Sequence, residues 1–196
     1  QAKRLPEIER FAADAPVFIA GSTWPPDEEL LVGLIERYPD VKFIVAPHEI
    51  DPARIEKFCE RISRPALRYT QLTPQSDLAA AGVLFVDTIG ILSSVYRYGR
   101  WGYIGGGFGA GIHNTLEAAT FGLPLAFGPR YGKFREARDL VTLRGAASVA
   151  SAEELERWFA GLHDDPDATG RSGTICKEYV LQHKGATARI MDEICR

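Results

Sequence analysis

Seven short apolar segments alternate with amphipathic or polar segments along this chain of 196 residues, and this alternation constrains the fold more than any other feature. Repeated βαβ units produce such a pattern. Several of the segments are apolar throughout, as strands buried on both faces of a sheet have to be. We therefore predict an α/β fold in which a parallel sheet is covered by helices on both faces. The predicted strands span residues 16–21, 42–47, 67–72, 83–88, 101–106, 124–129 and 146–150.

Helices are predicted between these strands. The segment 25–38 opens with two prolines followed by acidic residues, and its leucines and Ile35 recur on one helical face. A turn is predicted over residues 163–173, between the last two helices, and no repeat or linker divides the chain. We therefore expect residues 1–196 to form a single domain. The other predicted helices lie at about 51–63, 91–98, 115–122, 133–143, 152–163 and 174–194.

The charge and the cysteines argue against several classes of function. The net charge of −3 argues against a nucleic-acid partner, because such a partner requires a basic face that displaces phosphate counterions. Cys59, Cys176 and Cys195 lie far apart without the C-x-x-C spacing of metal or redox sites, which fits a reduced cytosolic compartment. No apolar run approaches the roughly 18 residues that a membrane span needs. These features predict a chain that is soluble as given.

Glycine and polar residues follow five of the predicted strands. The first strand ends in Gly21-Ser22-Thr23, the second in Pro47-His48-Glu49 and the fourth in Asp87-Thr88-Ile89-Gly90. The fifth strand runs into residues 105–111, which contain five glycines, and the sixth runs into "GPRYGKF" at 128–134. Because ligands of an open parallel sheet bind at the carboxyl ends of its strands, we predict a binding site at this edge.

The segment that follows the five glycines has two interpretations. Asn114 is a preferred N-cap residue, and Glu117 three positions later completes a capping box, so both residues can serve the helix alone. Alternatively, the glycines let a ligand approach backbone N–H groups, the helix N-terminus faces a phosphate, and Glu117 accepts hydrogen bonds from ribose hydroxyls. The local sequence leaves both interpretations open.

Other ligand and catalytic motifs are absent or misplaced in the sequence. Gly105-x-Gly107-x-x-Ala110 matches a dinucleotide fingerprint, but it follows the fifth strand, and no acidic residue ends the next strand. Neither the G-x-S-x-G of hydrolases nor the H-E-x-x-H of zinc enzymes occurs. Asp165-Pro166-Asp167 lies in the predicted turn, where helix capping is the expected role. We therefore predict no metal and no cofactor.

Five stretches together resemble one enzyme family, in the same order and over nearly the whole chain. They are "GS" at 21–22, "PHE" at 47–49, "DTIGIL" at 87–92, "GGGFGAGIHNTLEAATFGLPLAFGP" at 105–129 and "KFREA" at 133–137. The family is that of the 3-deoxy-D-manno-octulosonic acid (Kdo) transferases, and the similarity is to their carboxyl-terminal half. The His-Asn-x-Leu-Glu-Ala-Ala run, followed by Gly-x-Pro and Gly-Pro, is the most specific element.

The resemblance implies the Rossmann-like, carboxyl-terminal half of a two-domain GT-B fold. This half holds the nucleotide-sugar donor in such enzymes, and the amino-terminal acceptor domain is expected to be absent from this chain. The implied activity is glycosyl transfer in lipopolysaccharide biosynthesis, from CMP-Kdo to a lipid A precursor, at the cytoplasmic face of a bacterial inner membrane. Contact with the membrane and the acceptor would go through the missing domain, so the chain alone is expected to be inactive.

The resemblance also assigns residues to the donor. Ala46, Pro47 and His48 would border the cytosine, Ile89–Ile91 would form the opposite wall, and Asn114–Glu117 would hold the phosphate and the ribose. The general base would lie in the missing half, so no catalytic residue is expected in this chain. The complete expected site consists of Gly21, Ser22, Ala46, Pro47, His48, Ile89, Gly90, Ile91, Gly106, Gly107, Asn114, Thr115, Leu116 and Glu117.

The sequence departs from the commoner family pattern in two places. Arg-His-Pro-Glu becomes Ala46-Pro47-His48-Glu49, and Gly-Gly-His-Asn-Pro becomes Gly111-Ile112-His113-Asn114-Thr115. The lost arginine changes the expected contacts to the base and the phosphate.

Two alternative functions stay open. One is a GT-B transferase or epimerase that uses a UDP-sugar, with Arg130, Lys133 and Arg135 near its second phosphate, and the other is a non-catalytic nucleotide-binding module.

Overall fold

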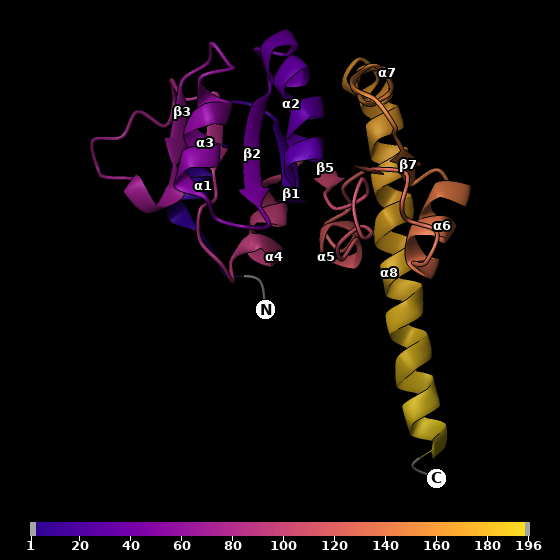
Figure 1. The fold of residues 1–196 in the computed structure, drawn as a ribbon. Helices are drawn as coiled ribbons and strands as arrows, with labels where there is room; N and C mark the ends of the chain where they lie inside the picture. Colours follow the sequence, from indigo (N-terminus) through magenta and orange to yellow (C-terminus); the bar gives the residue numbers. More distant parts are fainter. Residues whose placement is uncertain (1–2, 195–196) are drawn as a thin grey trace.

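A computed structural model describes the backbone of residues 3–194 and the side chains of residues 3–183. Within this range the chain forms a seven-stranded parallel sheet with the strand order β3-β4-β2-β1-β5-β6-β7 (Figure 1). Each strand overlaps a predicted one, so the parallel sheet and its strand positions are confirmed. The strands are β1 (Val17–Thr23), β2 (Lys42–Pro47), β3 (Ala66–Arg68), β4 (Val83–Phe85), β5 (Trp101–Ile104), β6 (Leu125–Phe127) and β7 (Ala146–Ser148).

Helices connect the strands at the expected places, although several are shorter than predicted. The predicted helix at 91–98 divides into an α-helix and a 3₁₀ turn, and a short helix, α1, lies in a segment where none is predicted. No helix among residues 3–194 is long and apolar enough to cross a membrane. The helices are α1 (Pro6–Phe11), α2 (Pro25–Arg37), α3 (Pro52–Cys59), α4 (Leu92–Val95), α5 (Leu116–Ala119), α6 (Arg135–Thr142), α7 (Ala152–His163) and α8 (Pro166–Ile194), with 3₁₀ turns at Tyr69–Gln71 and Tyr96–Tyr98.

Side chains of β1 alternate between two separate cores, one on each face of the sheet. Val17 and Ile19 belong to the core that α1, α4, α5, α6 and α8 cover. Phe18 and Ala20 belong to the core that α2, α3 and α7 cover. Helices therefore flank the sheet on both faces, which confirms the predicted α/β class (Figure 1). Burial on both faces also explains why the strands are apolar throughout.

The turn predicted at 163–173 is wrong, because α8 begins at Pro166. Asp165 caps this helix: its Oδ1 accepts hydrogen bonds of 3.0 Å from the backbone N–H groups two and three residues further on. The capping role expected of Asp165 is therefore confirmed. Gly173 lies inside the helix, and a side chain there would overlap the backbone carbonyl of Gly122. This glycine allows α8 to pack closely against the end of α5 and does not mark a turn.

The crevice of the fold lies between β1 and β5, the adjacent strands at which the strand order reverses. β1 pairs with β2 on one side and with β5 on the other. The connection after β1 leads into α2 and the connection after β5 leads into α5, and these helices cover opposite faces of the sheet. Open α/β sheets bind their ligands at such a switch point, outside the carboxyl ends of the strands.

The end of α7 carries a histidine whose charge is coupled to stability. His163 Nε2 lies 2.6 Å from Asp40 Oδ2, and His163 Nδ1 lies 3.0 Å from Asp164 Oδ1. Burial lowers the pKa of His163, but the hydrogen bonds to the two carboxylates outweigh burial, so the pKa is raised above its ordinary value of 6.5. Because the unfolded chain keeps the ordinary value, the charged ring stabilises the fold fully below about pH 6.5. This stabilisation is lost as the pH rises through the folded-state value.

Replacement of His163 by glutamine is therefore expected to cost more stability in acid than in base. Both carboxylates are mostly exposed, so we expect a loss in unfolding free energy of about 0.5–1 kcal/mol at about pH 5.5 and a clearly smaller loss at about pH 9. Urea denaturation of the two proteins across this pH range measures the difference. A loss that grows with rising pH would contradict the assignment.

Candidate functional site

Backbone hydrogen bonds bring the ends of four strands together in the order β4, β2, β1 and β5. The N–H of His48 donates to the carbonyl of Thr23 at 2.9 Å, and the N–H of Gly105 donates to the carbonyl of Gly21 at 2.9 Å. On the other side of β2, the residue that follows β4 donates to the β2 backbone at 2.8 Å. The segments that follow these strands therefore meet at one edge of the sheet, as the sequence predicts.

The end of β1 packs directly against the end of β5, with no side chain between the two backbones. A side chain at Gly105 would overlap the backbone of Ser22, and a side chain at Gly21 would overlap the phenol oxygen of Tyr96. Ser22 has a left-handed φ of 54° and lies where the pairing register of β1 shifts. Close packing accounts for both glycines without a ligand. The donor contacts expected of Gly21 and Ser22 stay predictions.

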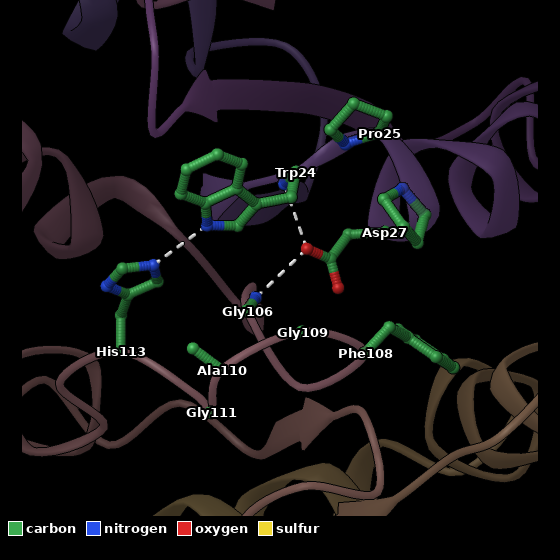
Figure 2. Close-up of a pocket in the computed structure, with 10 residues that line it drawn as sticks. Trp24, Pro25, Asp27, Gly106, Phe108, Gly109, Ala110, Gly111 and His113 are labelled. Carbon is green, nitrogen blue, oxygen red and sulfur yellow. Dashed lines mark hydrogen bonds between the residues drawn. The ribbon is translucent and has the colours of Figure 1, made fainter.

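Asp27, in the first turn of α2, joins the two loops that border the crevice. Its buried carboxylate accepts hydrogen bonds from the backbone N–H groups of Trp24 at 2.9 Å and Gly106 at 3.0 Å, and from the hydroxyl of Tyr103 at 2.6 Å. Hydrogen bonds to a charged acceptor are roughly twice as strong as neutral ones. One side chain thus ties the β1–α2 loop and β5 to the glycine loop, residues 105–111 (Figure 2).

The glycine loop is held by the end of β6. The N–H of Arg130 donates to the carbonyl of Gly107 at 2.8 Å, and its guanidinium donates to the carbonyl of Gly109 at 2.7 Å. Gly107 lies against Gly128, whose backbone would be 2.6 Å from an added Cβ atom, and Gly106 has a left-handed φ of 96°. These contacts explain the glycines by backbone packing and conformation. Contact of Gly106 and Gly107 with the donor stays a prediction.

The helix after the glycine loop begins later and is shorter than predicted. α5 starts at Leu116 and spans a single turn, so Asn114 is not its N-cap and the predicted capping box is wrong. Asn114 Oδ1 instead accepts from the N–H of Leu116 at 2.9 Å in an Asx turn, and Asn114 Nδ2 donates to Glu117 Oε1 at 3.1 Å. The dipole of so short a helix is small, so a phosphate here would depend on individual donors. Glu117 is partly exposed, and its assignment to the ribose stays a prediction.

The residues expected around the cytosine differ in their exposure. Residues 46–47 are buried in the sheet, whereas His48 is exposed. On the β4 side, Ile89 is 83% exposed, Gly90 has a left-handed φ of 83°, and Ile91 packs partly against the core. His48 and Ile89 therefore offer the most accessible surfaces to a base. Their assignment to the cytosine stays a prediction.

An aromatic cluster of Trp24, His48 and His113 lies between these loops, and the predicted site does not include two of its members. The indole N–H of Trp24 donates to His113 Nε2 at 3.1 Å. The ring of His48 stacks on both, with its centroid 4.7 Å from that of Trp24 and 4.3 Å from that of His113. Trp24 directly follows β1, and His113 lies in the family motif that follows β5. These positions at the carboxyl ends of two strands could have placed both residues in the predicted site.

A pocket of about 370 Å³ lies between the β1–α2 loop and the glycine loop (Figure 2). The glycine loop lines it on one side, and the other lining residues are Trp24, Pro25, Pro26, Asp27 and His113. Concave, mostly apolar pockets with a few polar groups are the usual form of small-molecule sites. This pocket lies at the switch point between β1 and β5, beside the segments that the sequence assigns to the donor.

An ion pair between the buried Glu28 and the partly buried Arg54 supports the loop that carries His48. Glu28 Oε2 lies 3.5 Å from Arg54 Nε, and Glu28 Oε1 accepts from the hydroxyl of Thr23 at 3.0 Å. Arg54 also donates to the carbonyl of Glu49 at 2.9 Å, next to His48. Burial raises the pKa of Glu28, and Arg54 and Thr23 offset the rise only in part. This group fixes the start of the β2–α3 loop relative to β1.

Asp87, the first residue of the "DTIGIL" stretch, holds two strand ends together. Its carboxylate accepts from the N–H of Thr70 at 2.9 Å, from the Thr70 hydroxyl at 2.6 Å and from Arg68 Nε at 2.8 Å. Burial by itself raises the pKa of Asp87, but these hydrogen bonds outweigh burial and hold the pKa below its usual range. The carboxylate thus positions the turn that carries Ile89. Its hydrogen bonds go to other residues of the protein, so we assign it no contact with a ligand.

Comparisons with known proteins test the resemblance. No protein-family model matches the chain. A Kdo transferase of Rickettsia bellii is 28% identical over 198 residues, which cover 97% of this chain and 46% of the relative. The resemblance to Kdo transferases is confirmed. The chain spans less than half the length of the curated relatives it matches.

Solved structures share the fold of this chain. The C-terminal CMP-Kdo binding domain of WaaA from Acinetobacter baumannii matches with a TM-score of 0.75 and 22% identity, over 91% of this chain and 100% of that chain. Anabaena HepE in complex with UDP-glucose matches with a TM-score of 0.64 and 14% identity, over 92% of this chain and 49% of that chain. Like the Kdo transferase domain, this chain therefore has the Rossmann-like fold of a GT-B carboxyl-terminal domain.

Proposed function

We propose that residues 1–196 form the donor-binding domain of a Kdo transferase and bind CMP-Kdo at the carboxyl edge of the sheet. The supporting observation is that the segments after β2, β4 and β5 meet at this edge, around the switch point beside β1. These are the segments that the family motifs assign to the donor. The similarity to Kdo transferases over 97% of the chain supports CMP-Kdo as the nucleotide sugar.

Each segment contacts one part of the donor in this proposal. His48 and Ile89 contact the cytosine, Glu117 accepts hydrogen bonds from the ribose, and residues 114–116 bind the phosphate. The hydroxyl of Thr115 is buried and has no hydrogen-bond partner within the described part of the chain. Such a group is rare in folded proteins, but because Thr115 is fully buried, a phosphate oxygen could become its partner only if the segment around it shifts when the donor binds.

The complete reaction is proposed for a longer protein, in which a second domain carries the acceptor site and the general base. That protein would transfer Kdo to a lipid A precursor at the cytoplasmic face of a bacterial inner membrane. The greater length of the relatives supports this arrangement, because the chain covers 46% of one and 41% of another. Among residues 3–183, whose side chains the structure describes, no group of His, Cys, Asp and Glu is placed to hold a metal ion, and the proposal assigns none.

A UDP-sugar is the second candidate donor, because a protein of similar fold holds UDP-glucose. Its second phosphate would require additional cationic donors near the glycine loop. Arg130 lies there, but its Nη1 is engaged by the carbonyl of Gly109, and Arg135 pairs with Asp139 at 3.6 Å. Lys133 is exposed, so a second phosphate would depend mainly on this one lysine, and the single phosphate of CMP makes the smaller demand on the site.

We expect the chain to bind CMP about fivefold or more tightly than UMP, because uracil reverses the donor and acceptor pattern of cytosine and loses at least one hydrogen bond. Calorimetric titration with CMP, UMP, UDP and NAD measures the preference. The comparison of UMP with UDP isolates the contribution of the second phosphate. Equal or tighter binding of UDP would move the assignment to the alternative donor, and tighter binding of NAD would contradict both.

A further inference from the structure

His113 is held by neighbours on three sides. Its Nε2 accepts a hydrogen bond from the indole N–H of Trp24 at 3.1 Å. One face of its ring stacks on His48, with ring centroids 4.3 Å apart and planes 23° from parallel. Its Cδ2 edge faces Gly106, where an added Cβ atom would lie 3.0 Å away. The ring is therefore held in one orientation, which a side chain at position 106 would disturb.

The hydrogen bond from Trp24 decides which nitrogen of His113 carries a proton. An indole N–H is a donor only, so His113 Nε2 has to be unprotonated in order to accept from it. A neutral imidazole then carries its proton on Nδ1. Figure 2 shows the Nδ1 edge turned away from Trp24, and no residue of the described chain hydrogen-bonds to it. The partly exposed ring thus presents an unused N–H.

The charges around His113 favour its neutral form. Burial and the stacked His48 lower the pKa of His113, and Asp27 from α2 raises it by less. The carboxylate of Asp27 is already shared among three donors. Along the same segment, Glu117 is the next acidic residue, and it accepts a hydrogen bond from Asn114. At neutral pH the ring is therefore an uncharged donor with a fixed direction.

We propose that His113 donates its Nδ1–H to the phosphate of the nucleotide donor, and that Trp24 is a positioning residue that selects this tautomer. The inference rests on the proposed function, which places the phosphate beside Asn114 and Thr115, the residues that follow His113. A donor that is already oriented needs no reorganisation when an anion binds, so its hydrogen bond contributes more to binding. Trp24 acts only through the imidazole ring.

NMR of the isotope-labelled imidazole nitrogens tests the tautomer. At about pH 7.5 we expect His113 Nε2 to show the shift of an unprotonated nitrogen and Nδ1 that of a protonated one. Trp24→Phe keeps an aromatic ring but removes the indole donor, so both signals should move towards values typical of mixed tautomers. A protonated Nε2 in the unsubstituted chain would overturn the inference.

Titration with CMP and cytidine separates contact with the phosphate from contact with the nucleoside. We expect CMP to shift the Nδ1–H signal of His113 strongly, and cytidine, which has the same base and ribose without the phosphate, to shift it only slightly, through the base against the stacked His48. Binding of CMP with no change at Nδ1 would overturn this inference and leave the proposed function standing. Failure of CMP to bind the unsubstituted chain would overturn the proposed function and this inference with it.

Variants at His113 give the size of the effect. His113→Gln places its amide near the Nε2 position and lacks a donor at Nδ1, so CMP should bind about 10-fold more weakly. His113→Asn places its amide near Nδ1 and should recover most of this loss. Trp24→Phe should weaken CMP by about 2- to 5-fold, as the fraction of the competent tautomer falls.

The matched control is His163→Gln, which changes a histidine beside Asp40, at the opposite edge of the sheet. It should leave the affinity for CMP unchanged, and all variants should bind cytidine like the parent. Equal CMP affinity in His113→Gln and the parent, measured on proteins with the same melting temperature, would overturn the proposal. So would an equal loss in His113→Gln and His113→Asn.

Discussion

Replacement of Asp27 by alanine is expected to lower the free energy of unfolding by about 3–4 kcal/mol, because buried donors lose their shared acceptor. These donors are the backbone N–H groups of Trp24 and Gly106 and the hydroxyl of Tyr103. Burial and the neighbouring Asp27 carboxylate raise the pKa of Tyr103, so its phenol remains a donor. Chemical denaturation of the two proteins measures the loss. The affinity for CMP should also fall, because the glycine loop loses its link to α2.

Two milder variants distinguish the hydrogen bonds from the volume of the side chain. Asp27→Asn can still accept from both N–H groups, which share one oxygen, and can donate to Tyr103, so its cost should be about 1 kcal/mol. Tyr103→Phe removes one of the donors and should cost about 1 kcal/mol. A loss below about 1 kcal/mol in Asp27→Ala would show that this carboxylate does not hold the two loops together.

Replacement of Glu117 by glutamine is expected to weaken CMP binding by about 5- to 30-fold, because charge-assisted hydrogen bonds to the ribose hydroxyls become neutral ones. Stability should change by at most about 0.5 kcal/mol. The structure supports this second expectation, because Glu117 Oε1 accepts from Asn114 Nδ2 at the surface, and the glutamine carbonyl can accept the same bond. Calorimetric titration and thermal denaturation of the two proteins measure both effects.

Glu153→Gln is the matched control, since Glu153, like Glu117, is an acidic residue in the first turn of a helix. It lies at the start of α7, which follows the edge strand β7, away from the switch point between β1 and β5. Its substitution should leave the affinity for CMP unchanged. An unchanged affinity in Glu117→Gln would leave Glu117 as a partner of Asn114 alone, and the best-motivated residue of the proposed site would be lost.

The meeting of the donor segments at one edge was predictable from the sequence. His48 and the segments 89–91 and 105–117 each follow an apolar strand, and the carboxyl ends of parallel strands lie on the same side of a sheet. The family motifs occur in these segments, so fold and candidate site were predicted together. Burial within the site was predictable only in part: the predicted strand at 42–47 places residues 46–47 inside the sheet, but no local pattern distinguishes the buried Thr115 from the exposed Asn114 beside it.

Residue types that are typical of turns and helix caps gave wrong predictions where a tertiary contact determined the backbone conformation. Gly173 resembles a turn residue in the sequence, but it lies within α8 because the backbone of Gly122 leaves no room for a side chain. Asn114 resembles an N-cap, yet it forms an Asx turn and α5 starts only at Leu116. In both cases the residue type is compatible with two backbone conformations, and packing against the rest of the chain selects one.

The sequence by itself determined the α/β class, the strand positions and the edge at which a nucleotide sugar is expected, because apolar runs and motifs are local features. Only the tertiary structure decided which side chains meet in the crevice. Trp24 hydrogen-bonds to His113, 89 residues away, and Asp27 to Gly106, 79 residues away. These contacts exist because β1 and β5 are neighbours in the sheet. Strand order results from the packing of the whole chain, and no local pattern around Trp24 or His113 specifies it.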